Sequence, residues 1–213
     1  VVISPAVSAE LINIEVTDEY LKKIKQKFSI TDEYLLSICT LQPRKNLISL
    51  INAYEIYRDK NKESGIKLVL TGQLGWKFDN IIRRIKQSKY KEDIILTGYV
   101  EENEMAALYK GALAFAYISY FEGFGMPVLE ALHYGKAVLT SNTTSMPEVG
   151  GEAAFYCDPY HLDSIYTSLE CLLENKECRE NLQEKAVLQA EKFSYRTSAE
   201  KLENVFNQVY EIN

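Results

Sequence analysis

Two glutamates eight positions apart flank a glycine-rich turn in the segment YISYFEGFGMPVLEAL, residues 117–132. Glu122 follows an apolar stretch, and Glu130 lies after a proline, a residue suited to the first turn of a helix. Gly125 and its neighbour Met126 would then stand at a helix start, where free N–H groups bind phosphate. The segment therefore predicts that backbone amides bind a diphosphate and that Glu130 reaches a hydroxylated group beside it.

A structural role for both carboxylates is the alternative. Glu122 would then cap the N-terminus of the helix, where a negative charge is favourable, and Glu130 would form an ion pair at the surface. A simple turn, however, needs neither two glycines, Gly123 and Gly125, nor a second carboxylate. The arrangement favours a functional site, because glycines let the backbone approach a ligand closely.

Two adjacent cations, Arg44 and Lys45, lie in the loop TLQPRKN, residues 40–46, which leads from an expected strand into an expected helix. Positive side chains at a helix N-terminus are unfavourable by about 0.3 kcal/mol or more, because the helix dipole is already positive there. An anion bound at this loop would remove the conflict. The alternative is a pair of solvated surface cations.

Two further loops have the composition of tight turns. TGQLGWK (71–77) includes Gly72, and TSMPEVGGEAA (144–154) places a glutamate after a proline. Each alone is more typical of a well-made turn than of a site. His133 and His161 are expected to be packed or surface residues, since the sequence shows no Ser/His/Asp or Cys/His arrangement for nucleophilic catalysis and no D-x-D motif for a divalent metal.

Elements that position these loops follow from the hydrophobic pattern. Short apolar runs predict six buried strands, at 34–39, 66–72, 93–99, 112–118, 136–141 and 153–158. Segments of helical period separate them, including the stripe that begins at Leu47 and the segments 78–88, 101–110 and 127–134. This alternation predicts a doubly wound, Rossmann-like parallel sheet of about six strands with helices on both faces. Its ligand crevice would lie outside the carboxyl ends of the strands.

The segment after Asp158 is expected to be all helical, over roughly 161–175, 177–192 and 196–212. The last of these helices has an apolar stripe between Leu202 and Tyr210, which predicts a face that packs against something. The pattern contains no linker or internal repeat, so residues 1–213 are expected to form a single domain.

Bulk properties limit the class of protein. A formal net charge of -6 and a pI near 5.2 argue against a nucleic-acid partner. The four cysteines form no C-x-x-C pair, which favours reduced thiols over a disulfide framework. No run approaches the ~18 apolar residues that span a bilayer. The start, VVISP, has neither an initiator Met nor a signal pattern, and we expect the chain to be part of a longer protein.

Four loops in this order resemble the C-terminal half of a retaining GT-B glycosyltransferase of family four, also called group 1. EGFGMPVLE is similar to that family's E-x7-E motif, with Glu122 and Glu130 both in place, and TLQPRKNL resembles its phosphate loop. GQLGW and SMPEVGGEAA are similar to further stretches of the family. The likeness extends over nearly the whole chain, from VVISPAV to the helix FSYRTSAEKLENVF.

The resemblance implies that the chain binds a nucleotide diphosphate sugar without a metal or other cofactor. Arg44 and Lys45 would neutralise the diphosphate, Glu130 would accept hydrogen bonds from the ribose, and the catalytic residue Glu122 would contact the transferred sugar. The residues implied to bind the donor are Arg44, Lys45, Gly72, Tyr99, Val100, Gly123, Phe124, Gly125, Met126 and Glu130. Tyr99 and Val100 would border the base.

Two departures from the family pattern stand out. Many members have Gly-Arg where this chain has Cys39-Thr40, so one expected cation is missing. The N-terminal domain that binds the acceptor in such enzymes is absent from these 213 residues. It is therefore expected either as a removed half or as a separate partner subunit, and the isolated chain is expected to transfer little or nothing.

The resemblance also implies the reaction. A hexose would move with retention to a glycan or lipid acceptor, from a GDP-mannose-like donor by preference or from a UDP-sugar. Cytoplasmic location follows, with the full protein peripheral at the inner face of the membrane, and the last helix offers a surface for a homodimer. One alternative is a non-catalytic or split-subunit nucleotide-binding module. A dinucleotide-binding oxidoreductase is disfavoured, because CTLQPRKN lacks the glycines of G-x-G-x-x-G.

Overall fold

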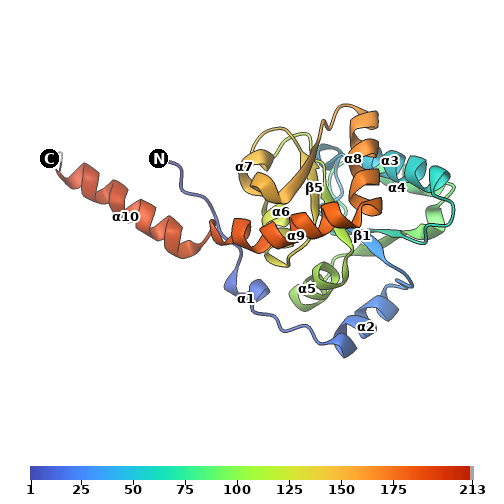
Figure 1. The fold of residues 1–213 in the computed structure, drawn as a ribbon, viewed down its shortest axis with the longest axis horizontal. Helices are drawn as coiled ribbons and strands as arrows, with labels where there is room; N and C mark the ends of the chain where they lie inside the picture. The colour runs from blue at the N-terminus through green and yellow to red at the C-terminus, as the bar shows by residue number, and fades with distance from the viewer. Residues whose placement is uncertain (212–213) are drawn as a thin grey trace.

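A single six-stranded parallel sheet forms the centre of the computed structural model, which describes residues 1–211 (Figure 1). The strands are β1 (Tyr34–Ile38), β2 (Lys67–Thr71), β3 (Ile94–Gly98), β4 (Ala114–Tyr117), β5 (Val138–Ser141) and β6 (Ala154–Cys157). Every neighbouring pair in the order β3-β2-β1-β4-β5-β6 is parallel. Each strand lies inside a predicted apolar run, and the predicted fold class is confirmed.

The strand order explains where a ligand crevice belongs. The chain moves outward from β1 to β2 and β3, then returns to place β4 on the other side of β1. The order therefore reverses between β1 and β4, and in such sheets the loops at the carboxyl ends of those two strands open a crevice. Every residue of β1, β4 and β5 is buried, as expected for strands covered on both faces.

Helices cover both faces of the sheet (Figure 1). They are α1 (Ala9–Ile12), α2 (Asp18–Lys27), α3 (Leu47–Lys60), α4 (Asp79–Gln87), α5 (Glu102–Gly111), α6 (Met126–His133), α7 (Met146–Gly150), α8 (Leu162–Glu174), α9 (Lys176–Glu191) and α10 (Tyr195–Glu211). In the described part of the chain three short 3₁₀ turns, η1 (Pro43–Lys45), η2 (Lys91–Asp93) and η3 (Gly151–Ala153), join the other elements. α3 packs against α4 and α8, whereas α6 packs against α9 and α2 packs against α5. The all-helical C-terminal segment is confirmed.

Buried tyrosines place hydroxyl groups in the core, and these hydroxyls form hydrogen bonds inside the protein. Tyr34 donates its hydroxyl hydrogen bond to the carbonyl of Leu108 at 2.7 Å, and Tyr54 donates to the carbonyl of Ile66 at 2.7 Å. Both rings are fully buried. Burial of each ring contributes about 2–3 kcal/mol by the hydrophobic effect, and the hydrogen bonds avoid the penalty of an unpaired buried hydroxyl.

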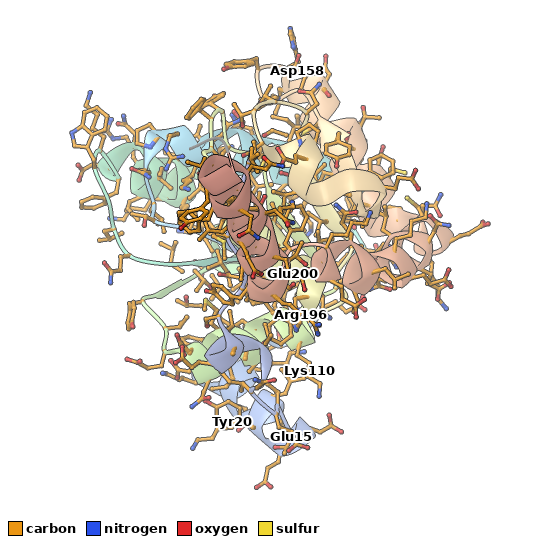
Figure 2. The ribbon with its side chains drawn as sticks, turned by 90° about the vertical axis from the view of Figure 1, so that its left-hand side faces the viewer. Glu15, Tyr20, Lys110, Asp158, Arg196 and Glu200 are labelled. Carbon is orange, nitrogen blue, oxygen red and sulfur yellow. The ribbon has the colours of Figure 1, made fainter. Side chains whose placement is uncertain are left out.

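The carboxyl ends of the strands point to one end of the molecule. Figure 2 shows Asp158, which directly follows β6, at that end, and Tyr20, Glu15 and Lys110 at the opposite end. The Nζ of Lys110 donates to the carbonyl of Val16 at 2.7 Å, which ties α5 to the segment before α2.

α10 extends away from the sheet and its helices (Figure 1). Its apolar side chains are exposed: Leu202 by 40%, Phe206 by 64%, Val209 by 56% and Tyr210 by 85%. The stripe predicted for this helix is therefore present and faces solvent. Residue 212, the predicted end of the helix, lies outside the described residues. Within residues 1–211 no helix has the length and apolar character needed to cross a bilayer.

Candidate functional site

The loop after β1 holds its two cations on a rigid turn. Arg44 and Lys45 belong to η1, and Asn46, in a left-handed conformation with φ 56°, separates them from α3. The side-chain amide of Asn46 donates to the carbonyl of Pro159 at 2.8 Å, and Tyr120 N–H donates to the carbonyl of Arg44 at 3.0 Å. The cations thus precede the N-terminus of α3 by one turn, and loops from two other strands fix their backbone.

Glu122 binds both cations. One carboxylate oxygen, Oε1, lies 2.7 Å from Lys45 Nζ, and the other, Oε2, lies 2.7 Å from Arg44 Nη1. The side chains of Lys45 and Glu122 are only 10% and 9% exposed, whereas that of Arg44 is 41% exposed. The anion expected at this loop is therefore supplied by the protein itself, from the loop after β4.

The ionised form of Glu122 is favoured by these contacts. Burial alone would raise the pKa of its carboxyl, but the hydrogen bonds from Lys45 and Arg44, with the nearby hydroxyl of Ser119, outweigh burial and lower the pKa below the ordinary value. The structural alternative for this residue is wrong. The N-cap of α6 is Gly125, and no side chain caps that helix end.

Tyr117, the last residue of β4, is a third polar partner that the sequence pattern did not indicate. Its hydroxyl donates to Glu122 Oε1 at 3.0 Å and accepts a hydrogen bond from Lys45. Lys45 Nζ also lies 4.9 Å from the centre of the tyrosine ring. Burial, and then the charge of Glu122, raise the pKa of Tyr117, so the phenol remains a donor. A tyrosine that ends an apolar strand just before the glutamate turn was the available signal.

The glycine turn leads into α6, which begins at Met126. Gly125 has φ 109°, and a Cβ there would lie 2.3 Å from the Cε of Met146, so this position requires glycine. At Gly123 a Cβ would meet nothing within 4 Å, which leaves open space over the backbone. The first N–H groups of α6 have no acceptor inside the helix, as at any helix start.

The loop after β5 supports this turn. Ser145 donates its hydroxyl hydrogen bond to the carbonyls of Phe124 at 2.7 Å and Glu122 at 3.1 Å. Glu122 N–H donates to the hydroxyl of Thr144 at 3.3 Å. The prediction that TSMPEVGGEAA is only a turn is therefore incomplete, because its first two residues hold the glutamate loop and α7 follows them.

Glu130 lies on α6 and binds a second buried tyrosine. The hydroxyl of Tyr109, on α5, donates to Glu130 Oε2 at 2.8 Å. Burial raises the pKa of Glu130, which the bond from Tyr109 opposes and the charge of Glu102 reinforces. Within the described part of the chain Glu130 forms no ion pair, so the surface ion pair considered as an alternative is wrong.

Three other predicted residues lie apart from the ion-paired group. Gly72 has φ 135°, and a Cβ there would lie 2.1 Å from the carbonyl oxygen of Cys39, so it permits close packing against the end of β1. Tyr99 is exposed and Val100 is buried, and both follow the edge strand β3. In the described region no hydrogen bond or ion pair links any of the three to Glu122.

The gathered groups can bind an anion beside hydroxyl groups. Arg44 and Lys45 supply positive charge, the start of α6 supplies N–H donors, and Glu122 supplies a carboxylate acceptor. Among residues 1–211 no three His, Cys, Asp or Glu residues gather as metal ligands would. A diphosphate joined to hydroxylated rings has the matching chemistry.

The sequence profile of the family "Glycosyl transferases group 1" matches residues 20–189, which include every residue of this site. The chain belongs to the glycosyl transferases group 1 family. The family and the GT-B fold that the motifs indicated are thereby confirmed for this glycosyltransferase domain.

Curated relatives of the domain include mannosyltransferases of Escherichia coli. It is 34% identical over 173 residues to the O-antigen chain mannosyltransferase B, a match that covers 81% of this chain and 45% of the relative. It is 33% identical over 199 residues to the serotype-specific mannosyltransferase WbdA, covering 92% of this chain and 24% of the relative. The domain thus spans about half of one relative's length and a quarter of the other's.

Solved structures share the fold. A glycosyltransferase from Rickettsia africae ESF-5 superposes over the whole chain with a TM-score of 0.87 at 18% identity, which covers 58% of that protein. Anabaena Alr3699/HepE, solved in complex with UDP and glucose, superposes over 95% of this chain and 55% of its own with a TM-score of 0.79 at 15% identity.

Proposed function

We propose that this domain binds the nucleotide diphosphate sugar of a hexosyltransferase. The observation that carries the proposal is the convergence of Arg44 and Lys45 on Glu122 at the carboxyl ends of β1 and β4. A diphosphate offers these cations more negative charge than one carboxylate does. The start of α6, at Gly125 and Met126, adds N–H groups that favour the same ligand.

Each predicted residue then has a role in transfer. The bond between the sugar's anomeric carbon and the diphosphate breaks, and the nucleotide diphosphate leaves with the bonding electron pair. An acceptor hydroxyl bonds to that carbon with retention of configuration, and its proton passes to the departing phosphate. Arg44 and Lys45 stabilise the charge that develops on the leaving diphosphate, which is preorganised electrostatic catalysis that requires no metal. Glu122 binds hydroxyls of the transferred sugar, and Glu130 binds the ribose.

The remaining donor contacts come from three loops. Tyr99 and Val100 border the base, Gly72 keeps the neighbouring loop close to the end of β1, and the turn from Gly123 to Phe124 covers the diphosphate. We favour mannose from a GDP-mannose-like donor because the relatives named above are mannosyltransferases. A UDP-sugar is the second candidate, since UDP is bound in a structure of the same fold.

The acceptor-binding part of the enzyme lies outside this chain in our proposal. The chain spans less than half the length of the two mannosyltransferases, and isolated it binds the donor and transfers little or nothing. The acceptor is a glycan or a lipid, and the full protein acts in the cytoplasm or at the inner face of the membrane. A subunit of a two-chain transferase, or a non-catalytic module, is the second candidate, because α10 exposes an apolar face that fits a partner.

Calorimetric titration tests the proposal. GDP, UDP and NAD are added to the chain in moderate salt with chelator present, and one nucleoside diphosphate is expected to bind. The double variant Arg44→Ala and Lys45→Ala should lose at least about tenfold in affinity, since each charged contact contributes about 1 kcal/mol or more. The matched control, Lys22→Ala with Lys23→Ala, removes two exposed cations on α2 and should bind as the parent does. No binding by the parent, or equal binding by both double variants, would overturn the assignment.

A further inference from the structure

A row of buried aromatic rings joins the two glutamates of the site. The ring of Tyr117 stacks 6.3 Å from that of Phe115 with an interplanar angle of 13°, and Phe115 lies 5.5 Å from Tyr109. The hydroxyl at one end of the row binds Glu122, and the hydroxyl at the other end binds Glu130. All three rings are at least 97% buried.

The backbone around each tyrosine is fixed. Tyr117 pairs with Thr140 in β5, and the hydroxyl of Thr140 donates to the carbonyl of Tyr117 at 2.7 Å. Tyr109 lies on α5 and stacks 5.3 Å from Tyr134 with an interplanar angle of 9°. Its hydroxyl also lies 3.4 Å from the carbonyl of Pro127 in the first turn of α6. These contacts hold each phenol in place. Each hydroxyl can therefore hold the carboxylate of its own glutamate at one position.

Ligand binding changes what holds Glu122. When a diphosphate takes the charge of Arg44 and Lys45, the carboxylate loses the ion pairs that balance its burial. A buried carboxylate left without donors is strongly unfavourable. Tyr117 is the donor that remains, because its hydroxyl donates directly to the carboxylate from the fixed end of β4. The buried hydroxyl of Ser119, which has no partner in hydrogen-bond geometry, lies close enough to influence the same carboxyl.

Glu130 has one fixed oxygen and one that is free for a ligand. Tyr109 binds Oε2, and no hydrogen bond in the described region involves Oε1. A carboxylate that binds two adjacent hydroxyls of a ribose must be held against rotation, and one strong bond to a buried phenol does so.

We infer that two phenols position the two glutamates for different parts of the donor. Tyr117 holds Glu122 toward the transferred sugar, and Tyr109 holds Glu130 toward the ribose. This inference rests on the proposed donor site and adds two positioning residues to it.

Affinities for three ligands separate the two roles. The chain is titrated with pyrophosphate, GDP and GDP-mannose, or with UDP and UDP-glucose in place of the last two if the parent prefers them. Tyr117→Phe should keep the affinity for GDP within about twofold and lose about fivefold or more of the additional affinity that the sugar provides. Tyr109→Phe should lose about fivefold or more of the affinity for GDP. Its affinity for pyrophosphate should not change, because pyrophosphate has no ribose.

Tyr34→Phe is the matched control. It removes a buried hydroxyl of equal burial at the opposite end of β1, where the partner is the carbonyl of Leu108. A merely structural loss would lower the melting temperature of all three variants. The ratios between the affinities for pyrophosphate, the nucleotide and the nucleotide sugar would then be alike in all three. That result, with the parent still binding GDP or UDP, overturns the inference alone. A parent that binds neither nucleotide overturns the proposed function with it.

A crystal structure of the unmodified chain with the bound nucleotide sugar gives an independent measurement should a variant fail to fold. The hydroxyl of Tyr117 is expected within hydrogen-bond distance of Glu122, and that of Tyr109 within hydrogen-bond distance of Glu130. A bound donor with either pair separated overturns the role of that tyrosine.

Discussion

Lys45 Nζ lies 2.7 Å from Glu122 Oε1, although 77 positions separate the two residues in the chain. Both side chains are nearly buried, and Arg44 completes the group from the solvent side. The site's own carboxylate therefore balances one of the two positive charges before any ligand arrives. A diphosphate has to compete with Glu122 for the cations, and the free energy of nucleotide binding includes the loss of these ion pairs.

Glu122→Gln tests this competition. The neutral amide binds the cations more weakly, so we expect GDP to bind roughly three- to tenfold more tightly to the variant than to the parent. The additional affinity for the sugar should fall, because Glu122 is proposed to bind the sugar hydroxyls. The free energy of unfolding should drop by roughly 1–3 kcal/mol, since Lys45 loses its charged partner in a buried position.

Calorimetry and urea unfolding measure the two effects. Glu203→Gln, which removes one exposed negative charge on α10, controls for the change in net charge and should alter neither quantity. If Glu122→Gln binds GDP no more tightly than Glu203→Gln does, the carboxylate and the nucleotide do not compete for the same cations.

The elements of this fold could be predicted from the sequence because they are local. Six apolar runs and the helical periods between them fixed the strands and most helices to within a few residues. α7 was missed, because its five residues, Met146–Gly150, are too few to show a period. The left-handed conformations at Asn46 and Thr144 were also missed, since both depend on contacts with other loops.

The site was harder to predict because its bonds join loops far apart in the chain. The cations and glutamates were identified, but nothing in their spacing shows that Glu122 forms ion pairs with both Arg44 and Lys45. Tyr117 illustrates the reason. Hydrophobic patterning predicts that the ring is buried, yet it does not show where the hydroxyl points, and the direction follows only from the strand order that brings β1 beside β4.

The pH dependence of nucleotide binding should identify Glu130. Burial raises its pKa above the ordinary 4.5, so the carboxylate is protonated at a higher pH than an exposed glutamate would be. As the pH falls from 8 toward 5, the protonated form accumulates and accepts hydrogen bonds from the ribose poorly, so the affinity for GDP should decrease. Glu130→Gln cannot titrate at this position and should show a flatter profile.

The comparison between parent and variant removes the contribution of the phosphate groups of GDP, which also titrate in this range. Calorimetry at half-unit pH intervals measures both profiles under the same conditions. Identical slopes for the two proteins would show that Glu130 does not bind the nucleotide.

The exposed face of α10 leads to a prediction about assembly. Leu202, Phe206 and Tyr210 expose apolar side chains on a helix that extends from the domain, and apolar surface of this kind favours association. We expect the isolated chain to form a homodimer at high concentration and Phe206→Glu to shift it to monomer. Light scattering after gel filtration measures the mass. Gln208→Glu adds the same charge at an exposed polar position of α10 and should leave the dimer intact. A parent that stays monomeric up to millimolar concentration would contradict the prediction.

The two glycines of the glutamate turn should respond differently to the same substitution. Gly125→Ala forces a side chain into φ 109° and against the Cε of Met146 at 2.3 Å, which we expect to cost about 1–3 kcal/mol in the free energy of unfolding. Gly123→Ala meets no atom within 4 Å and should leave stability unchanged. If the backbone at Gly123 approaches a bound diphosphate closely, the same methyl group should nevertheless weaken GDP binding several-fold. Urea unfolding and calorimetry on both variants separate the two effects. A stable Gly123→Ala variant with full affinity would show that the ligand does not lie over this turn.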